Sequence, residues 1–319
     1  AARSLATHAL SIFGDHSDVM ATRQTGCLII SSSSVQQAHD FALIAHLLAY
    51  KTSLPVIHFF DGFRTSHELQ KIDIIDDLLI KTLIPKKEIK AFKESAMSAS
   101  APYQKGTAQN PDVFFQNREL STKSYEDVYQ ICEKVLNDFY KVVGRKYSPL
   151  QLLGAKKPKK VIVSMGSSCE CIEEVLQSSQ FDDVALLNVH LFRPFGYDKL
   201  AQILPQSVEK VIVLDRTKEC GAREPLYLDV CTALKSRPNI KVLGGRYGLG
   251  GKEFTPAMAV AVIKNFDNEK DDFTVGIDDD VLNSSLPVEE SPSKTSNFEM
   301  KFYGLGSDGT VSASKSTIK

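Results

Sequence analysis

Residues 11–48, SIFGDHSDVMATRQTGCLIISSSSVQQAHDFALIAHLL, decide the fold of the first half of this chain. A polar, glycine-bounded segment leads directly into an apolar run at 27–30, which predicts a short buried strand. Apolar residues then recur every three or four positions, which predicts a helix that begins near Ser33 or Ser34 and extends to about residue 49.

A second stretch, PVIHFFDGFRTSHE at 55–68, completes this unit. Its apolar part predicts a strand over 56–60, so the order strand, helix, strand indicates a parallel crossover. Ligands of parallel α/β sheets bind at strand ends. We therefore expect functional residues in the two polar loops, 14–26 and 61–68.

The composition is that of a globular protein with room for two domains. The 319 residues are 43% hydrophobic and 24% charged, with a net charge of −1 and a pI near 6.7. This balance indicates neither a nucleic acid nor a membrane partner, and no apolar run is long enough to span a bilayer. The six cysteines have no zinc or iron–sulfur spacing, so we interpret them as reduced structural thiols and expect no metal site.

The middle of the chain is less regular. We expect a helix over 2–13, a short amphipathic helix near 84–95 and a longer helix over 125–143. Residues 100–119 have little periodicity, so we interpret them as a long polar loop that wraps a neighbour.

After residue 149 the pattern becomes regular and predicts a doubly wound parallel sheet covered on both faces. An acidic, Ser/Pro-rich segment at 267–297 is interpreted as a linker or surface strap, and 298–304 as a strand that opens a third unit. The expected strands are 161–165, 184–192, 211–214 and 240–243, and the expected helices are 168–179, 197–204, 225–235 and 256–266.

Arg23, in the segment ATRQTG, is the candidate binding residue of the first loop. An arginine on short, glycine-bounded backbone can hold a carboxylate through two parallel hydrogen bonds. The alternative is an internal ion pair with Asp15 or Asp18, and the residue types alone favour neither.

Three other groups each allow two interpretations. Gly304, Gly306 and Gly309 form GLGSDG, either a phosphate-binding turn or a tight turn that needs glycine. The sequence Gly166-Ser167-Ser168 could bind an anion, although a serine helix cap is favoured. His58 is expected to be a hydrogen-bonded core residue.

The third of these groups is the pair His67 and Glu68 in the loop 61–68. His67 beside Glu68 could be a general base, although a salt bridge that stabilises the loop, with Arg64 nearby, is favoured.

The chain resembles the pyruvate:ferredoxin (flavodoxin) oxidoreductases, a 2-oxoacid oxidoreductase family. The resemblance rests on segments that occur in family order and span nearly the whole chain. They are SIFGDHSDVMATRQTG, SSSVQQAHD, HFFDGFRTSHELQKI, KGTAQNPDVFFQ, VIVSMGSSCECIEEV, LFRPF, VLDRTKECGAREPLYLDV, GGRYGLGGKEFTPAM, FTVGIDDDV and GLGSDGTV.

The resemblance implies an internal piece of a larger enzyme. Residues 1–148 would be part of a thiamine-enzyme pyrimidine-binding domain, and 149–297 a domain similar to the transketolase C-terminal domain. Residues 298–319 would begin a third, coenzyme A-associated domain. The acid that activates the cofactor would precede Ala1, and the diphosphate–Mg²⁺ motif and cluster cysteines would follow Lys319, so this piece alone should be inactive.

The implied reaction is thiamine-dependent oxidative decarboxylation of pyruvate to acetyl-CoA and carbon dioxide. Electrons would pass through [4Fe–4S] clusters to ferredoxin or flavodoxin, and Arg23 would hold the pyruvate carboxylate. A homodimer is implied, in the cytoplasm or the matrix of a redox organelle and not secreted. Alternatives are a relative that uses another 2-oxoacid or reduces NADP, and a non-catalytic scaffold of the kind found in a sulfite reductase flavoprotein.

Overall fold

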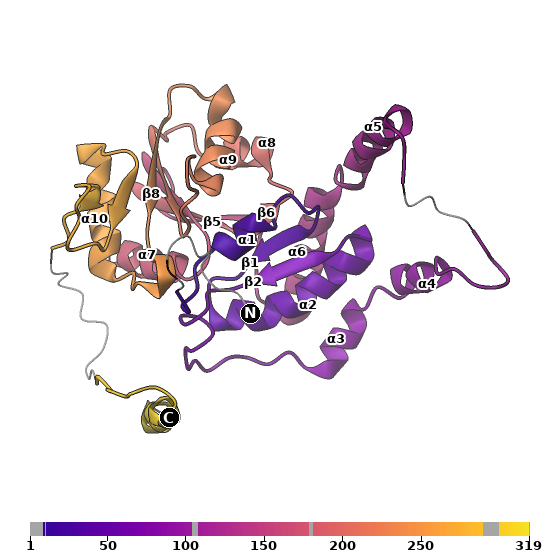
Figure 1. Ribbon diagram of the computed structural model, residues 1–319, viewed down its shortest axis with the longest axis horizontal. Coiled ribbons are helices and arrows are strands. Elements are labelled where there is room, and N and C mark those ends of the chain that lie inside the picture. Colours follow the sequence, from indigo (N-terminus) through magenta and orange to yellow (C-terminus); the bar gives the residue numbers. More distant parts are fainter. Residues whose placement is uncertain (1–8, 10, 104–107, 179–180, 290–299, 319) are drawn as a thin grey trace.

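The computed structural model describes residues 9, 11–103, 108–178, 181–289 and 300–318. It contains two α/β bodies that lie against each other, a small one formed mainly by the first half of the chain and a larger one formed by the second half (Figure 1). No helix in the described part of the chain is long and apolar enough to cross a membrane.

The small body is built on a three-stranded sheet of order β2-β1-β6. Strands β1 (Leu28–Ser31) and β2 (Val56–Phe59) are parallel, as the crossover pattern predicts, and helix α2 (Val35–Thr52) connects them. The Ser34 side chain accepts a hydrogen bond from the Gln37 N–H, which confirms the expected helix start. The third strand, β6 (Leu191–Arg193), comes from the second half of the chain and is antiparallel to β1.

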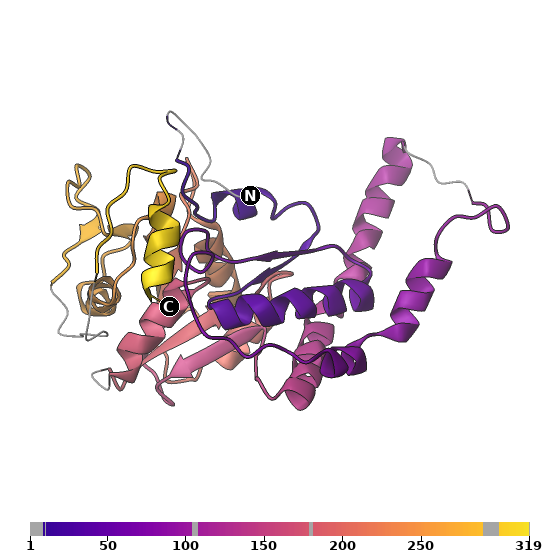
Figure 2. The ribbon, with the colours of Figure 1, turned by 90° about the horizontal axis from the view of Figure 1, so that it is seen from below.

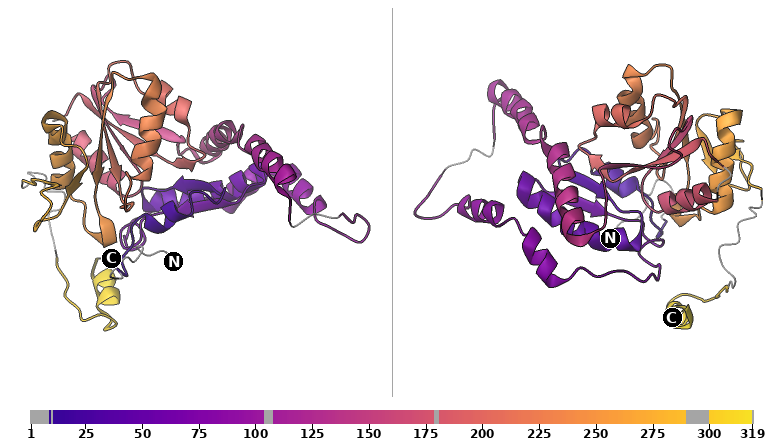
Figure 3. Two further views of the ribbon diagram at one scale, coloured as in Figure 1. Left: turned by 45° about the horizontal axis from the view of Figure 1, so that its top comes forward. Right: turned by 180° about the vertical axis from the view of Figure 1, so that it is seen from behind.

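Helices α2 and α6 (Val128–Val143) pack on one face of this sheet. The helix α4 (Lys86–Glu94) lies against the end of α2, where the Tyr50 and Phe92 ring centroids are 6.0 Å apart, and an arm that carries α5 (Pro111–Leu120) projects away from both bodies (Figure 3). The expected polar loop over 100–119 is therefore wrong where α5 forms, because Pro111 occupies the first helical turn, where its fixed φ favours helix. The arm is preceded by α3 (Asp77–Leu83) and followed by a short 3₁₀ turn, η1 (Ser121–Ser124).

The larger body contains a seven-stranded sheet of order β10-β9-β8-β7-β4-β5-β3. All neighbouring strands are parallel except β3, which pairs antiparallel with β5, so the predicted parallel α/β fold is confirmed. Its strands are β3 (Leu150–Gly154), β4 (Lys160–Ser164), β5 (Val184–Val189), β7 (Lys210–Asp215), β8 (Lys241–Arg246), β9 (Phe273–Val275) and β10 (Ser285–Leu286).

Helices cover both faces of the large sheet. Alternate residues of each strand point to opposite faces, so Ile162 of β4 joins a core with α7 and α10, whereas Val161 and Val163 join a core with α8 and α9. The helices are α7 (Ser168–Gln177), α8 (Tyr197–Ile203), α9 (Pro225–Ala233) and α10 (Pro256–Asn268), with 3₁₀ turns η2 (Leu234–Ser236) and η3 (Leu249–Gly251).

One hydrophobic core joins the two bodies. It includes Met20, Ile29 and Phe59 of the small body together with residues of β4, β5 and β7. The helix α1 (Ser17–Ala21), which contributes Met20, therefore lies against the large body (Figure 1). The predicted domain limits at 148 and 297 stay predictions, but the bodies they separate share a core and a strand.

Several expectations were wrong. Residues 11–13 of the expected first helix are not helical, and most of that stretch lies outside the described residues. The strand expected over 184–192 is divided, because β6 turns away to join β1. The expected strap contains β9 and β10, which extend the large sheet, and its last part, 290–297, lies outside the described residues.

The final segment also differs from its expectation. Residues 300–304 form no strand, although a helix, α11 (Thr310–Ile318), does begin after the glycine-rich turn. This helix lies apart from the two sheets (Figures 1 and 3), although it overlaps them in the view from below (Figure 2).

Candidate functional site

Arg23 lies just after α1, on a turn that is fixed at both ends. At the start, Asp15 accepts a hydrogen bond from the Ser17 N–H (2.9 Å), and Met20 is buried in the shared core. At the end, the Tyr125 hydroxyl donates to the Gly26 carbonyl over 2.7 Å. Gly26 has a φ of +88°, and a Cβ there would lie 2.8 Å from the tyrosine oxygen, so the turn requires glycine. The backbone thus holds Arg23 in a defined place.

The Arg23 guanidinium is oriented by its own backbone and holds a carboxylate. Its Nη1 donates to the Met20 carbonyl (2.7 Å), and its Nη2 lies 3.1 and 3.0 Å from the two carboxylate oxygens of Glu219. The structure therefore shows an internal ion pair, one of the two alternatives, but its partner is neither Asp15 nor Asp18. The true partner lies on the loop between β7 and α9, so the pair connects the two bodies.

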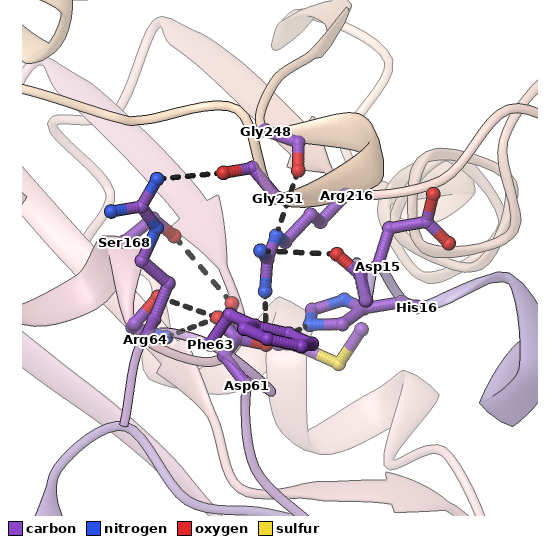
Figure 4. A network of polar contacts seen from close by, with 12 residues as sticks. Asp15, His16, Asp61, Phe63, Arg64, Ser168, Arg216, Gly248 and Gly251 are labelled. Carbon is purple, nitrogen blue, oxygen red and sulfur yellow. Dashed lines mark hydrogen bonds and ion pairs between the residues drawn. The ribbon is translucent and has the colours of Figure 1, made fainter. Parts of the chain in front are cut away.

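Asp61 lies at the centre of a second contact between the bodies, which we call the Asp61 clamp: His16, Asp61, Ser167 and Arg216. Its His16, Asp61 and Arg216 side chains are buried and lie together in Figure 4. His16 Nε2 is 2.6 Å from an Asp61 oxygen, and the Ser167 N–H donates to the other oxygen over 2.9 Å. The Arg216 Nη1 lies 2.9 Å from Asp61, close enough for an ion pair.

The clamp keeps its carboxylate ionised. Burial alone would raise the pKa of Asp61, but the charges of His16 and Arg216 and the hydrogen bonds from His16 and Ser167 together hold it well below its usual range. Ser167 immediately precedes α7, so this carboxylate also lies at the positive end of a helix. The anion at this helix start is therefore a side chain of the protein.

The loop 61–68 is held against the large body. Arg64 donates to the Gly251 carbonyl (2.7 Å, Figure 4) and lies 3.7 Å from Glu253, so the salt bridge of this loop is made by Arg64 with a residue of the large body. The His67 ring stacks on Phe63 and its Nδ1 is hydrogen-bonded to Ser66. These contacts fit a structural role for the loop.

Two further expectations concerned single polar residues. His58 is hydrogen-bonded to Ser32 (2.6 Å) as expected, and burial lowers its pKa to about 4. Ser167 occupies the N-cap position of α7, as expected for a serine here, but its side chain makes no capping hydrogen bond and donates to Asp61 instead, while Ser168 bonds to Ser164.

The glycine-rich turn before α11 is occupied by its own aspartate. The Asp308 carboxylate accepts hydrogen bonds from the Thr310 hydroxyl and from the Thr310 and Leu305 N–H groups, and these bonds lower the pKa of Asp308 to about 2. Gly306 and Gly309 have positive φ values. This geometry favours the interpretation that glycine serves the backbone, and phosphate contact at Gly304, Gly306 and Gly309 stays a prediction.

The described residues include no group of three or more His, Cys, Asp or Glu side chains that could hold a metal ion. The six cysteines are free thiols. Burial raises the pKa of the Cys132 and Cys171 thiols to about 12, so both are protonated near neutral pH.

The sequence interpretation missed Glu219 and most of the Asp61 clamp. One signal was present: Ser167, Arg216 and Asp61 all follow the carboxyl ends of expected parallel strands, β4, β7 and β2. Such ends meet at one edge of a sheet. Asp61 follows a strand of the small sheet, whereas Ser167 and Arg216 follow strands of the large sheet, and no local pattern in the sequence indicates that they pair.

Comparison with known families gives two matches from one enzyme family. Residues 1–137 match the family described as pyruvate flavodoxin/ferredoxin oxidoreductase, thiamine diphosphate-binding, and residues 159–259 match pyruvate:ferredoxin oxidoreductase core domain II. Together these matches span most of the chain.

Individual relatives agree. The chain is 50% identical to a pyruvate:ferredoxin oxidoreductase of Moorella thermoacetica and 49% identical to a probable pyruvate-flavodoxin oxidoreductase of Escherichia coli, in each case over the whole chain and 28% of the relative. It is 44% identical to a pyruvate dehydrogenase [NADP(+)] of Cryptosporidium parvum, of which it covers 17%. The chain thus spans less than a third of the length of these relatives.

A solved structure shares the fold. It is a 2-oxoglutarate:ferredoxin oxidoreductase from Magnetococcus marinus with 2-oxoglutarate, coenzyme A and succinyl-CoA bound. The TM-score is 0.52 at 18% identity, over 82% of this chain and 47% of the other. With two family models and these relatives in agreement, the chain belongs to the pyruvate:ferredoxin/flavodoxin oxidoreductase family.

Proposed function

We propose that this chain supplies the substrate-carboxylate clamp of an enzyme that oxidatively decarboxylates pyruvate. The observation that carries the proposal is the Arg23 guanidinium, which is fixed by the Met20 carbonyl and already holds a carboxylate. Arginine binds carboxylates through charge-assisted, directional hydrogen bonds. The relatives named as pyruvate oxidoreductases support the choice of substrate.

In this role Arg23 would bind and orient the substrate. Its charge would neutralise the carboxylate, and the rigid turn between α1 and Gly26 would fix the direction of the keto carbon. Thiamine diphosphate, when bound, supplies the electron sink for decarboxylation. The complete enzyme would also use Mg²⁺, [4Fe–4S] clusters and coenzyme A, reduce ferredoxin or flavodoxin, and form a homodimer.

The described residues fit only part of this machinery. They hold a carboxylate-binding guanidinium, but no side-chain group among them has the composition to bind a metal ion or an iron–sulfur cluster. The steps assigned to this chain therefore end with substrate binding and orientation.

The electron acceptor has a second candidate. The Cryptosporidium relative named pyruvate dehydrogenase [NADP(+)] is 44% identical to this chain over its whole length. Acetyl-CoA formation with purified ferredoxin, flavodoxin or NADP as the only acceptor would distinguish them.

Substitution of Arg23 tests the proposal in the complete enzyme. We expect Arg23→Ala to lower kcat/KM for pyruvate by about 30-fold to 1000-fold, since removal of a charge-assisted contact costs about 2–4 kcal/mol of transition-state stabilisation. Arg23→Lys should recover part of this loss, because it keeps the charge without the planar fork.

The matched control is Arg223→Ala. Arg223 is also partly exposed and pairs through two nitrogens with Asp271 (2.8 and 3.0 Å). This variant should keep kcat/KM within a few-fold of the parent. If Arg23→Ala behaved like the control, the assigned role of Arg23 would be wrong.

A further inference from the structure

Glu219 occupies Nη2 of the Arg23 guanidinium, a nitrogen that a substrate carboxylate would also use. Both of its carboxylate oxygens lie within 3.1 Å of Arg23 Nη2. Arg23 is the one charged partner of the Glu219 side chain among the described residues. A guanidinium that already holds one carboxylate cannot bind a second at the same nitrogen without displacing the first.

The pair is placed where exchange with a ligand is feasible. The Arg23 and Glu219 side chains are 23% and 33% exposed, so water can reach both. Partly exposed pairs of this kind have small net free energies, because the separated charges are rehydrated. The Met20 carbonyl holds the guanidinium independently of Glu219, so Arg23 stays oriented when the glutamate leaves.

The segment that carries Glu219 has few other attachments. It lies in the loop between β7 and α9, whose tip around Cys220 and Gly221 is exposed. Gly221 has a φ of +81°, and a Cβ there would meet no atom within 4 Å, so the tip is not packed. Lys218, which pairs with the buried Glu224 (3.1 Å), fixes the base of the loop.

We propose that Glu219 is a displaceable internal ligand of Arg23, which a 2-oxoacid carboxylate must replace in order to bind. This inference rests on the proposed function of Arg23. It makes Glu219 a positioning and specificity residue, because it keeps the guanidinium paired when no substrate is present. The apparent affinity for substrate is then the intrinsic affinity multiplied by the fraction of enzyme in which Glu219 does not occupy Arg23. A ligand without a carboxylate has no charge with which to replace it.

The kinetic test uses Glu219→Gln in the complete enzyme. Glutamine keeps the size but removes the charge, so we expect the KM for pyruvate to fall about 2- to 5-fold, with kcat changed less than 2-fold. In the Arg23→Ala background, Glu219→Gln should change KM by less than 1.5-fold, because the two residues act through one another.

The control is Glu209→Gln. Glu209 precedes the same strand β7 at its opposite end and pairs with Lys159 at the surface (3.8 Å), so the change in charge is identical. This variant should leave KM and kcat unchanged.

A second readout does not depend on turnover. Pyruvate should accelerate backbone hydrogen exchange in residues 217–222 of the wild-type enzyme, because it releases the loop. Glu219→Gln should show the faster exchange without pyruvate. Slower or unchanged exchange with pyruvate would overturn the proposal.

The outcomes separate this inference from the function on which it rests. If Arg23→Ala weakens pyruvate binding while Glu219→Gln leaves KM unchanged or raises it, the internal-ligand proposal is wrong and the Arg23 clamp stands. If Arg23→Ala leaves pyruvate kinetics unchanged, both are wrong.

Discussion

Two of the arginine–carboxylate pairs that connect the two bodies of this molecule, Asp61–Arg216 and Arg23–Glu219, differ in burial. In the Asp61 clamp, the Asp61 and Arg216 side chains are 0% and 2% exposed, whereas Arg23 and Glu219 are 23% and 33% exposed. A buried charge that loses its partner cannot recover hydration, but an exposed one can. Similar chemistry thus gives a fixed joint in one place and an exchangeable contact in the other.

The number of partners differs in the same direction. Asp61 is held by His16, Ser167 and Arg216, which come from three separate segments of the chain. Glu219 is held by Arg23 alone among the charged groups that the structure describes. Displacement of Asp61 would break contacts in both bodies at once, whereas displacement of Glu219 frees one loop.

The largest expected effect comes from Asp61→Asn. This change leaves Arg216 buried without its countercharge, so we expect the free energy of unfolding to fall by about 3–5 kcal/mol. Urea denaturation of the purified chain measures it. The control is Asp278→Asn, in which a 95% exposed aspartate 3.7 Å from Lys252 is changed, with an expected loss below about 0.5 kcal/mol.

A double variant sharpens this result. Asp61→Asn combined with Arg216→Gln removes the unpaired charge, so its loss of stability should be smaller than the sum of the two single losses. If the two single losses of stability simply add, the two residues are not energetically coupled, and the Asp61 clamp does not hold the two bodies together.

The pH dependence of the free energy of unfolding tests whether burial also affects a side chain that is neutral in the folded chain. His190 is 2% exposed, burial lowers its pKa to about 4, and its Nδ1 is hydrogen-bonded to the Ser148 carbonyl. The unfolded chain binds a proton near pH 6.5 and the folded chain does not until about pH 4. Stability is therefore full above pH 6.5 and is lost as pH falls from there towards 4.

The expected loss from His190 is on the order of 2 kcal/mol between pH 7 and pH 5. Urea midpoints at the two pH values measure the total loss, and His190→Gln should remove only the share of His190, because burial also lowers the pKa of His58 to about 4 and gives a similar loss. The Asp61 carboxylate contributes little in this window, because its depressed pKa keeps it ionised there. An unchanged pH dependence in His190→Gln would show that another group is responsible.

The sequence predicted the regular elements well because their signals are local. Apolar runs such as Val161 and Ile162 mark buried parallel strands, and the Ser34 cap marks the start of α2. The short strand β6 was missed because its three residues pair with β1, far away in sequence. In the sequence, residues 184–192 look like one continuous apolar strand, and only the pairing of β6 with β1 shows that this strand is divided.

The site follows the same logic. Arg23 was identified from its own loop, but its neighbours in sequence suggested Asp15 or Asp18 as partners. Glu219, the true partner, lies 196 positions away and is brought close only when the bodies pack. The clamp around Asp61 was missed for the same reason, since its charges come from separate strand ends.

The smallest expected effect separates the two pairs most clearly. Glu219→Gln should lower the free energy of unfolding by about 0.2–1 kcal/mol, because water replaces the lost carboxylate and Met20 still holds the guanidinium. The same urea titration that measures Asp61→Asn measures this. A loss above about 2 kcal/mol would mean that the Arg23–Glu219 pair holds the two bodies together, as the Asp61 clamp does. A substrate carboxylate that forms one ion pair with Arg23 could not then displace Glu219. A loss within the expected range leaves the loop between β7 and α9 free to exchange one carboxylate for another.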